Sequence, residues 1–496
     1  MRLSWQRGAG LGCLALAFLW VLRPIWGIDV FFHVAIGREI VDAGIPYLDV
    51  FSAAHPKVAW APFQVGYALF AHGVDALGGL DLLRICHAAL ITGTLALLWK
   101  RARGQLATLW SAALLMALFL VLFEERIRLR PHVFNLFFEV LILLPLASGA
   151  WRKDKRKWLW IVFGTSLAWT FMHSMGSLWL CCVVGTIAVA GADRDERRWG
   201  LKATLLAVLA VIVSPGALAG IIHVVSISGD WPLFVPELAP SWRWFEYQSA
   251  YGMVAGTVPW IAAAAVIMVA VGRPAPERRA TVLAAAGLAF GALWMVRLTY
   301  YSVFVFLLLA PELGDLAKGW AQGAKDRARN LKRIAILGIV LMALLLGWHR
   351  LPPTIDRGVN PWSTTLDPGA FPVAEVAVLK RAGVGEKIFN ASAWGGYLLY
   401  HLYPGARVIS DGRITFGKDV GDLLRIANNP RARLFVANMA RQNWNIDLLI
   451  WGRGVMRPND HWDLLLRGPV AEVWAPKGPI AQRYRDALQA SRTQPP

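Results

Sequence analysis

The first 349 residues of this chain contain a succession of apolar windows, each close to the length that crosses a lipid bilayer. A helix needs about 20 predominantly apolar residues to span the hydrocarbon core. The chain is 56% hydrophobic, more than a water-soluble protein of 496 residues needs to bury. The sequence therefore predicts a polytopic α-helical membrane protein with about eleven spans. The windows lie at 9–26, 80–99, 106–123, 131–149, 157–173, 176–192, 201–219, 251–271, 280–295, 297–313 and 331–349.

The connectors between these windows alternate in charge, and this alternation predicts the topology. Basic residues gather in every second connector, near 100–103, 152–157, 194–202, 273–279 and 318–333. The positive-inside rule places these connectors and the N-terminus in the cytoplasm, and everything after residue 350 outside. The net charge of +19 is thus explained by topology, and no nucleic-acid partner is expected. Arg23-Pro24 interrupts the far end of the first window, and no small-x-small cleavage pattern follows it, so we expect a retained first span.

The tail changes character after Pro352-Pro353. Short apolar runs alternate with helical patterns, which predicts a C-terminal α/β domain with a mainly parallel sheet. No Gly-x-Gly-x-x-Gly follows any expected strand, so no nucleotide site is predicted. The expected domains are a transmembrane domain (1–349) with a catalytic first outer loop (27–61), a linker (350–371) and a periplasmic α/β domain (372–496). Expected helices cover 373–383 and 394–402, and expected strands cover 386–390, 406–411, 446–452 and 470–476.

The first outer loop places an acid almost at the membrane surface. Asp29, His33 and Gly37 are spaced by four residues, so they share one face of a short helix. Its apolar neighbours favour a helix that lies flat on the bilayer and ends at Gly44. Such a helix could present a carboxylate to a membrane-bound substrate. It could equally be a connector whose charges are solvated.

A second cluster, Glu124–His132, follows the third window. It holds two acids, Glu124 and Glu125, and three arginines at alternate positions. Guanidinium groups donate paired hydrogen bonds that suit phosphate, and an extended segment would point all three to one side. The same residues could instead form an internal salt-bridge network. The arginines are Arg126, Arg128 and Arg130.

Two further groups lie at the ends of expected spans. Trp169, His173 and Gly176 lie at the outer end of the fifth window, where a histidine is either functional or a structural interfacial residue. Arg297, with Tyr300 and Tyr301 shortly after it, lies between two nearly continuous windows, where it either reaches the head groups or faces a polar cleft.

These features together resemble the GT-C superfamily of polytopic glycosyltransferases, whose acids follow the first and third spans. The tail order Phe389-Asn390, Ser392–Tyr397 and Arg407–Arg413 is similar to the Trp-Trp-Asp-Tyr-Gly region of oligosaccharyltransferase catalytic subunits. This chain has Gly395 where that motif has Asp, so recognition of a peptide acceptor is not implied.

The chain also resembles a broad group of bacterial membrane proteins with a shared first-loop pattern. That group also carries the Arg-Pro-His run (Arg130–His132) and the Trp…His…Gly run at 169–176. The first-loop pattern corresponds here to Asp29, Phe32, His33, Gly44, Pro46, Asp49 and Phe51-Ser52.

The resemblance implies an inverting glycosyltransferase of a bacterial inner membrane that uses a polyprenyl-phosphate or polyprenyl-diphosphate sugar donor. Asp29 would be the general base, and Asp29, Glu124 and Glu125 could hold a divalent cation, Mg or Mn. A non-catalytic scaffold, a lipid-binding subunit or a transporter is the alternative, and protein partners are not indicated. The residues expected to bind substrate are His33, Arg126, Arg128, Arg130, His132, His173, Arg297, Trp394 and Tyr397.

Overall fold

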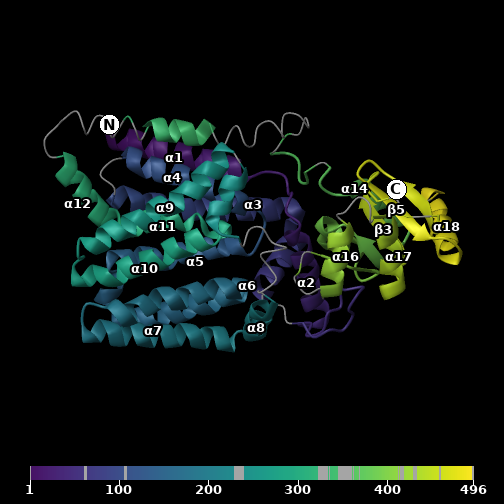
Figure 1. The fold of residues 1–496 in the computed structure, drawn as a ribbon, viewed down its shortest axis with the longest axis horizontal. Coiled ribbons are helices and arrows are strands. Elements are labelled where there is room, and N and C mark those ends of the chain that lie inside the picture. The colour runs from purple at the N-terminus through teal and green to yellow at the C-terminus, as the bar shows by residue number, and fades with distance from the viewer. Residues whose placement is uncertain are drawn as a thin grey trace. The chain divides into compact units, whose positions relative to one another are not determined.

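The chain folds into two compact units, which Figure 1 shows in a computed structural model. The first unit contains Met1–Leu22 and Ile85–Pro361, and the second contains Arg23–Arg84 and Trp362–Pro496. This division differs from the expected domains, because the first connector belongs to the unit of the tail. The structure describes residues 2–60, 64–105, 109–227, 239–247, 249–321, 333, 336–344, 360, 362–367, 369–411, 413, 418–427, 433–456, 458 and 460–493.

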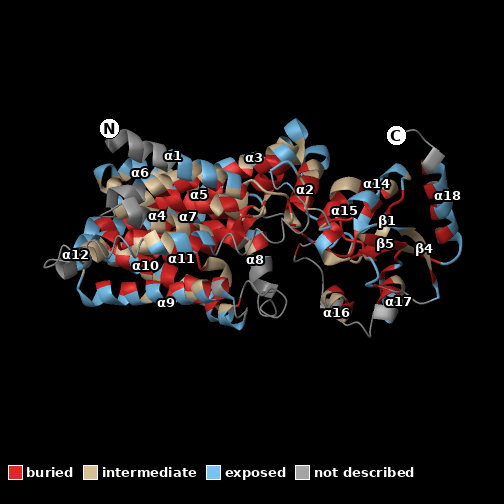
Figure 2. Cartoon of the chain, turned by 90° about the horizontal axis from the view of Figure 1, so that it is seen from above, coloured by how far each residue is buried: buried red, intermediate tan, exposed pale blue. Residues whose placement is uncertain are grey.

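The first unit is built from helices around a core of aliphatic and aromatic side chains. Phe119, Phe123, Val140 and Phe304 are among its buried residues, and the buried positions lie on the inner faces of the helices (Figure 2). Asp154 caps the N-terminus of α6 (Lys155–Ala190), because its side chain accepts a hydrogen bond from the Lys157 amide. The helices are α1 (Arg2–Val21), the later part of α3 (Val65–Gln105), α4 (Leu109–Phe123), α5 (His132–Ser148), α6 (Lys155–Ala190), α7 (Arg194–Val213), α8 (Ala217–Ile227), α9 (Ala250–Val271), α10 (Pro276–Trp294), α11 (Tyr301–Leu308) and α12 (Ala310–Ala321).

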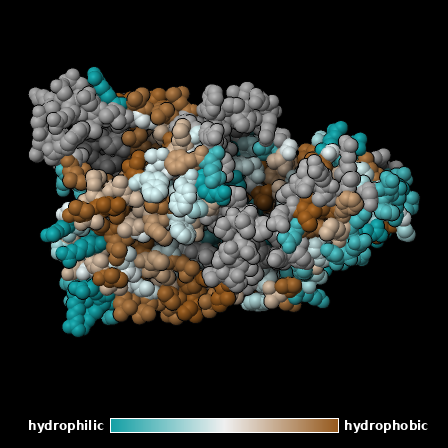
Figure 3. Space-filling model, viewed as in Figure 1, coloured by the Kyte–Doolittle hydropathy of each residue, from teal (hydrophilic) through white to brown (hydrophobic). Residues whose placement is uncertain are grey.

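The outer faces of these helices are apolar. On α7, Leu201, Leu205, Leu209 and Ile212 are exposed at spacings of three and four residues, and Figure 3 shows hydrophobic atoms along this helix beyond its charged first turns. Water-soluble proteins rarely leave such stripes uncovered. Two helices in the described part of the chain, Val65–Lys100 and Tyr251–Val271, are long and apolar enough to cross a membrane. These features support a membrane location, whereas the predicted count of eleven spans is not confirmed.

Several expected spans differ from the helices observed. The window 201–219 is interrupted where α7 ends and Ser214-Pro215-Gly216 intervenes before α8, since proline lacks the amide that would continue the helix. The window 297–313 is divided between α11 and α12, while 157–173 and 176–192 lie in one element, α6, kinked at His173. Of the window 331–349, the structure describes residue 333 and the helical residues 336–344.

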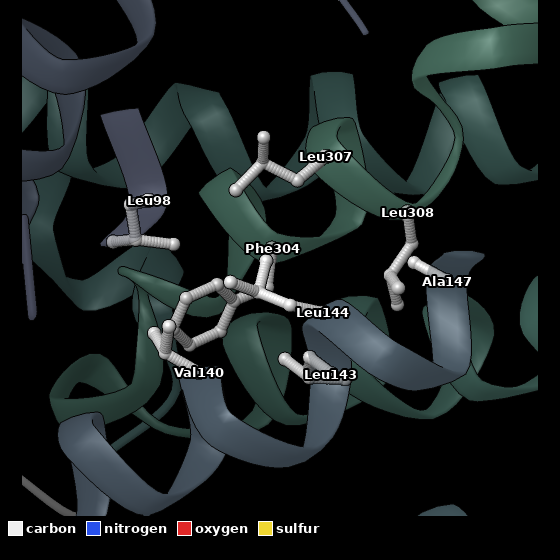
Figure 4. A pocket seen from close by; sticks show the side chains of 8 residues that line it. All are labelled: Leu98, Val140, Leu143, Leu144, Ala147, Phe304, Leu307 and Leu308. Carbon is white, nitrogen blue, oxygen red and sulfur yellow. The ribbon is translucent and has the colours of Figure 1, made fainter. Parts of the chain in front are cut away.

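One void between the helices of the first unit is small and apolar. Eight aliphatic or aromatic side chains from α3, α5 and α11 surround a cavity of about 10 Å³ (Figure 4). A space of that size holds at most one water molecule, and its apolar lining offers that water no hydrogen-bond partner. It is a packing gap rather than a ligand site.

The second unit contains a five-stranded sheet with the order β2-β1-β3-β5-β4. The predicted α/β tail is confirmed, as are the expected helices α14 (Val373–Arg381) and α15 (Gly395–Leu402). The prediction of a mainly parallel sheet is wrong, because β5 pairs antiparallel with both β3 and β4. The strands are β1 (Glu386–Asn390), β2 (Ala406–Val408), β3 (Leu448–Gly452), β4 (Trp462–Arg467) and β5 (Ala471–Pro476); helices α16 (Lys418–Ala427), α17 (Arg433–Trp444) and α18 (Pro479–Thr493) complete the tail.

The first connector completes this unit. Ser52 forms a parallel bridge with Val408. The Val408 amide donates to the Phe51 carbonyl at 3.0 Å, and the Ala53 amide donates to the Val408 carbonyl at 2.8 Å. The connector therefore covers the β2 edge of the sheet, which would otherwise expose unpaired backbone groups.

The connector helix α2 (Asp29–Ala43) is confirmed, but its expected position flat on a bilayer is not supported. All eight residues from Val30 to Gly37 are buried, because α2 packs against α15 and the start of α3. Gly396 makes this packing possible, since a Cβ there would meet the Ile28 carbonyl oxygen at 2.8 Å.

Candidate functional site

The cluster after α4 begins with a buried acid. Glu124 is fully buried, and the indole N–H of Trp20 donates to its carboxylate at 3.2 Å. Residues Glu124–Arg126 form a 3₁₀ turn rather than an extended strand, so alternation does not direct the three arginines to one side. Ile127 and Leu129, between the arginines, are buried as well. The side chain of Glu125 lies outside the described residues.

His132 begins α5 and folds back onto the 3₁₀ turn. Its ring Nε2 lies 3.0 Å from the backbone oxygen of Arg126, and a carbonyl only accepts, so Nε2 carries the hydrogen. Arg126, Arg130 and Arg297 all lie within electrostatic range of the His132 ring. The structure thus brings together four of the predicted residues from two segments separated by more than a hundred positions.

The Trp169, His173 and Gly176 run forms the kink of α6. His173 leaves helical geometry at φ −158° and ψ 90°, and its Nδ1 accepts from the Gly176 amide at 3.1 Å. The indole N–H of Trp169 donates to the Asn135 side chain at 2.7 Å, and a Cβ at Gly176 would overlap that pair. Because Nδ1 accepts, the hydrogen of a neutral His173 is on Nε2, which makes Nε2 a donor. Arg297 lies within electrostatic range of this ring also.

A buried carboxylate next to this group has no counterpart among the predicted site residues. Glu139 on α5 is fully buried and accepts from the hydroxyls of Tyr301 at 2.9 Å and Tyr300 at 3.3 Å. Tyr300 also packs edge-on against Phe123, the residue before Glu124, with ring centroids 5.1 Å apart. Glu139 therefore ties the turn that carries Arg297 to the cluster after α4. Glu139 could have been predicted as a functional candidate, because it is an acid within the apolar window 131–149.

Asp29 and His33 belong to the second unit. Asp29 is partly exposed in the first turn of α2, where the helix dipole favours a negative charge. His33 is 2% exposed and packs between Phe32 and Tyr67, with ring centroids at 4.3 and 4.8 Å. This setting favours a packing role for His33, while its predicted contact with substrate remains a prediction.

Trp394 and Tyr397 are also buried. The indole N–H of Trp394 donates to the Ala370 carbonyl at 2.9 Å, and Tyr397 packs edge-on against Phe31 at 5.1 Å. Between them, Gly395 lies so close to the Ser410 carbonyl that a Cβ would overlap it. The position where the oligosaccharyltransferase motif has Asp thus has no room for a side chain. Substrate binding by this pair stays a prediction.

A buried ion network joins the connector to the tail, and it was not predicted as a unit. Arg413 donates to Asp49 at 3.1 Å and to Asp411 at 2.8 Å, and its guanidinium lies over the rings of Phe51 and Trp60. Burial alone would lower the Arg413 pKa, but the carboxylates of Asp411 and Asp49 outweigh burial and raise that pKa. Asp49 and Arg413 therefore stabilise the packing of the connector against the tail.

The predicted divalent cation finds no support in the described residues. They bring together no group of three His, Cys, Asp or Glu side chains able to hold a metal. Glu124 accepts from the Trp20 indole, and the side chain of Glu125 lies outside the described residues.

Neither a protein-family profile nor a curated protein sequence matches the chain. Solved structures do. The archaeal oligosaccharyltransferase AglB from Archaeoglobus fulgidus, in complex with an inhibitory peptide and a dolichol-phosphate, aligns with a TM-score of 0.58 and 13% identity over 90% of this chain and 70% of AglB. The Archaeoglobus fulgidus oligosaccharyltransferase with Zn and sulfate gives 0.54 and 12% over 88% of this chain and 67% of that one. The predicted resemblance to GT-C glycosyltransferases is thereby confirmed at the level of the fold.

Proposed function

We propose that the protein is an integral-membrane glycosyltransferase that moves a sugar from a polyprenyl-phosphate or polyprenyl-diphosphate donor to an acceptor. The observation that carries the proposal is the similarity over 90% of the chain to an oligosaccharyltransferase solved with dolichol-phosphate. The charge pattern of the connectors supports a bacterial inner-membrane location, with the cytoplasmic N-terminus and the periplasmic tail on opposite sides.

The arginine and histidine group of the first unit would bind the donor phosphate. Arg126 and Arg297 come from different segments yet lie close enough to act on the same histidine. Guanidinium groups in an apolar surrounding stabilise the negative charge that develops on a departing phosphate. The Nε2–H of His173 would add a neutral donor.

Asp29 would act as the general base that takes the acceptor proton, with direct inversion at the anomeric carbon. A positioned base contributes about 10²–10⁴-fold to the rate. Asp29 is suited to this role because it is partly exposed and because the N-terminus of α2 favours its ionised form.

The test compares cells that lack the protein after complementation with wild type, Asp29→Asn or Asp42→Asn. Asp42 is an exposed acid in the last turn of the same helix, so it controls for the loss of a charge from α2. Surface glycans and lipid-linked sugars are measured by mass spectrometry, and protein levels by immunoblotting.

We expect a missing sugar to be restored by wild type and Asp42→Asn, but not by Asp29→Asn at equal protein level. Restoration by all three proteins would refute Asp29 as the base and favour a scaffold, a lipid-binding subunit or a transporter. For the proposed donor-phosphate site, Arg126→Ala should weaken lipid-donor binding, whereas Arg243→Ala, at an exposed arginine of the same unit, should not. Equal affinities would refute that assignment.

A further inference from the structure

Glu139 is a buried acid that the proposed transfer does not use. It lies in α5 and is fully buried, in surroundings where a carboxyl group is costly. Buried charged groups can often be replaced by apolar side chains without loss of stability, so packing alone does not account for an acid here. Its role is therefore indicated by the groups that it binds.

The groups that Glu139 binds are two tyrosines at the start of α11. The Tyr301 hydroxyl donates to its carboxylate at 2.9 Å, and the Tyr300 hydroxyl donates at 3.3 Å. Both tyrosines follow closely on the 3₁₀ turn Val296–Leu298, which carries Arg297. Because the chain from this turn to α11 is so short, holding the two hydroxyls also holds the turn.

The elements on both sides of this contact are packed or hydrogen-bonded. Val140, next to Glu139, and Phe304 on α11 line the same small apolar cavity (Figure 4). At the other end of the turn, the Val296 amide donates to the Ala239 carbonyl at 2.7 Å. The position of the turn between these anchors therefore depends on where the tyrosines are held.

The helix that carries Glu139 also carries a residue of the proposed donor site. His132 and Glu139 are seven residues apart on α5, about two helical turns, so they lie on one face about 10 Å apart along the axis. Arg126 and Arg297 both lie within electrostatic range of His132. Arg126 also lies within that range of the Tyr300 side chain. Glu139 therefore connects the residues assigned to the donor phosphate.

We infer that Glu139 is a positioning residue of the proposed donor-phosphate site: through the two tyrosine hydroxyls it sets the position of Arg297 relative to His132. The inference rests on the proposed function, and it assigns no contact between Glu139 and the donor. A carboxylate suits this role because its two oxygens can accept from both hydroxyls, whereas a glutamine offers a single oxygen acceptor.

The test measures binding of undecaprenyl phosphate, and of undecaprenol as the same lipid without its phosphate, to the full chain in a nonionic detergent by microscale thermophoresis. The difference between the two affinities isolates the contribution of the phosphate, and undecaprenol binding reports that a variant is folded. The variants are Glu139→Gln, Glu139→Ala, Arg297→Ala and the double variant with alanine at both positions.

Glu196→Ala is the matched control. Glu196 is also a buried acid of the first unit, and it accepts from Arg152 at 2.6 Å. Arg152 follows the C-terminal end of α5, whereas His132 begins this helix, and its 17 residues correspond to about 25 Å. The control therefore loses a buried acid at the end of α5 that is remote from the proposed donor site.

We expect Arg297→Ala to bind undecaprenyl phosphate at least about tenfold more weakly than wild type, since a hydrogen bond to a charged group corresponds to roughly that factor. Glu139→Ala should lose about threefold or more, and Glu139→Gln should lose less. The double variant should bind no more weakly than Arg297→Ala alone, because Glu139 acts through Arg297. Glu196→Ala should match wild type, and undecaprenol should bind equally to every variant.

Three results would overturn the inference and leave the proposed function standing: losses that add in the double variant, wild-type affinity of Glu139→Ala, or an equal loss of affinity for both lipids. The proposed function fails in a different way. If wild type binds undecaprenyl phosphate no more tightly than undecaprenol, or if Arg297→Ala binds it as wild type does, the donor-phosphate assignment is refuted and the inference is refuted with it.

Discussion

Gly395 offers a sharp test of how the tail packs. Its backbone lies in the ordinary helical region, with φ −58° and ψ −45°, so alanine meets no conformational strain there. The whole effect of Gly395→Ala is therefore steric. The added Cβ would overlap the Ser410 carbonyl and lie 2.6 Å from the Asp411 Cα.

The Ser410 carbonyl cannot move without loss, because it accepts from the buried Asn390 side chain at 2.7 Å. Overpacking costs about 1–3 kcal/mol, and loss of a buried hydrogen bond costs about 1–3 kcal/mol more. The combined destabilisation is roughly 2–6 kcal/mol, which raises the opening equilibrium roughly 30-fold or more.

The assay is hydrogen exchange of the full chain in detergent, read on peptides that cover β1 and β2. Gly73→Ala is the matched control: Gly73 lies in α3 of the same unit, and a Cβ there meets nothing within 4 Å. Alanine should stabilise that helix by about 0.5–1 kcal/mol. We expect faster exchange in β1 and β2 for Gly395→Ala and unchanged or slower exchange for Gly73→Ala. Wild-type protection in Gly395→Ala would refute the packing described.

Three further changes test other buried groups. Glu139→Ala leaves the Tyr301 hydroxyl without its acceptor and should cost about 1–3 kcal/mol, whereas Glu139→Gln keeps an acceptor and should cost less; equal unfolding temperatures would contradict this. Burial, with Lys380 and Arg38 nearby, lowers the pKa of His401 to about 4, so the unfolded chain binds the proton first, and stability should fall as pH drops from about 6.5 towards 4. His401→Asn should flatten that dependence in a thermal-unfolding series, and an unchanged slope would rule out His401 as its source. Arg413→Met leaves two buried carboxylates unpaired and should cost about 3–5 kcal/mol, part of which Asp49→Asn should restore; additive effects in the double-variant cycle would exclude the coupling.

Local pattern predicted the elements of the tail but not their assembly. The helix at Val373–Arg381 and the strand at Glu386–Asn390 follow from short-range periodicity, and both are confirmed. Strand β4 was missed because Leu464–Leu466 is a continuous apolar run with a bulge, which obscures the alternation of a strand. The Gly468-Pro469 pair that follows it was the available turn signal. Without β4, strand–helix alternation indicated a parallel sheet.

The candidate site was predicted in parts. Charge at the expected span ends selected Arg126, His132, His173 and Arg297, and in the structure Arg297 lies within electrostatic range of both histidines; their role in binding stays a prediction. Glu139 was missed because it was counted within an apolar window. Trp394 and Tyr397 were predicted from a motif. The sequence does not show that both side chains are buried, or that Gly395 lies against the Ser410 carbonyl. Their burial depends on contacts between segments far apart in the chain.

The bridge between Ser52 and Val408 has a consequence for how the protein is made. The two residues are separated by 408 − 52 = 356 positions. At about 5–20 residues per second, the connector leaves the ribosome roughly 20–70 seconds before its partner strand exists. During that interval the Phe51–Ala53 backbone has no strand to pair with, and Asp49 has no arginine at 413. The order of synthesis therefore leaves the Phe51–Ala53 backbone without its β2 partner until the tail has been made.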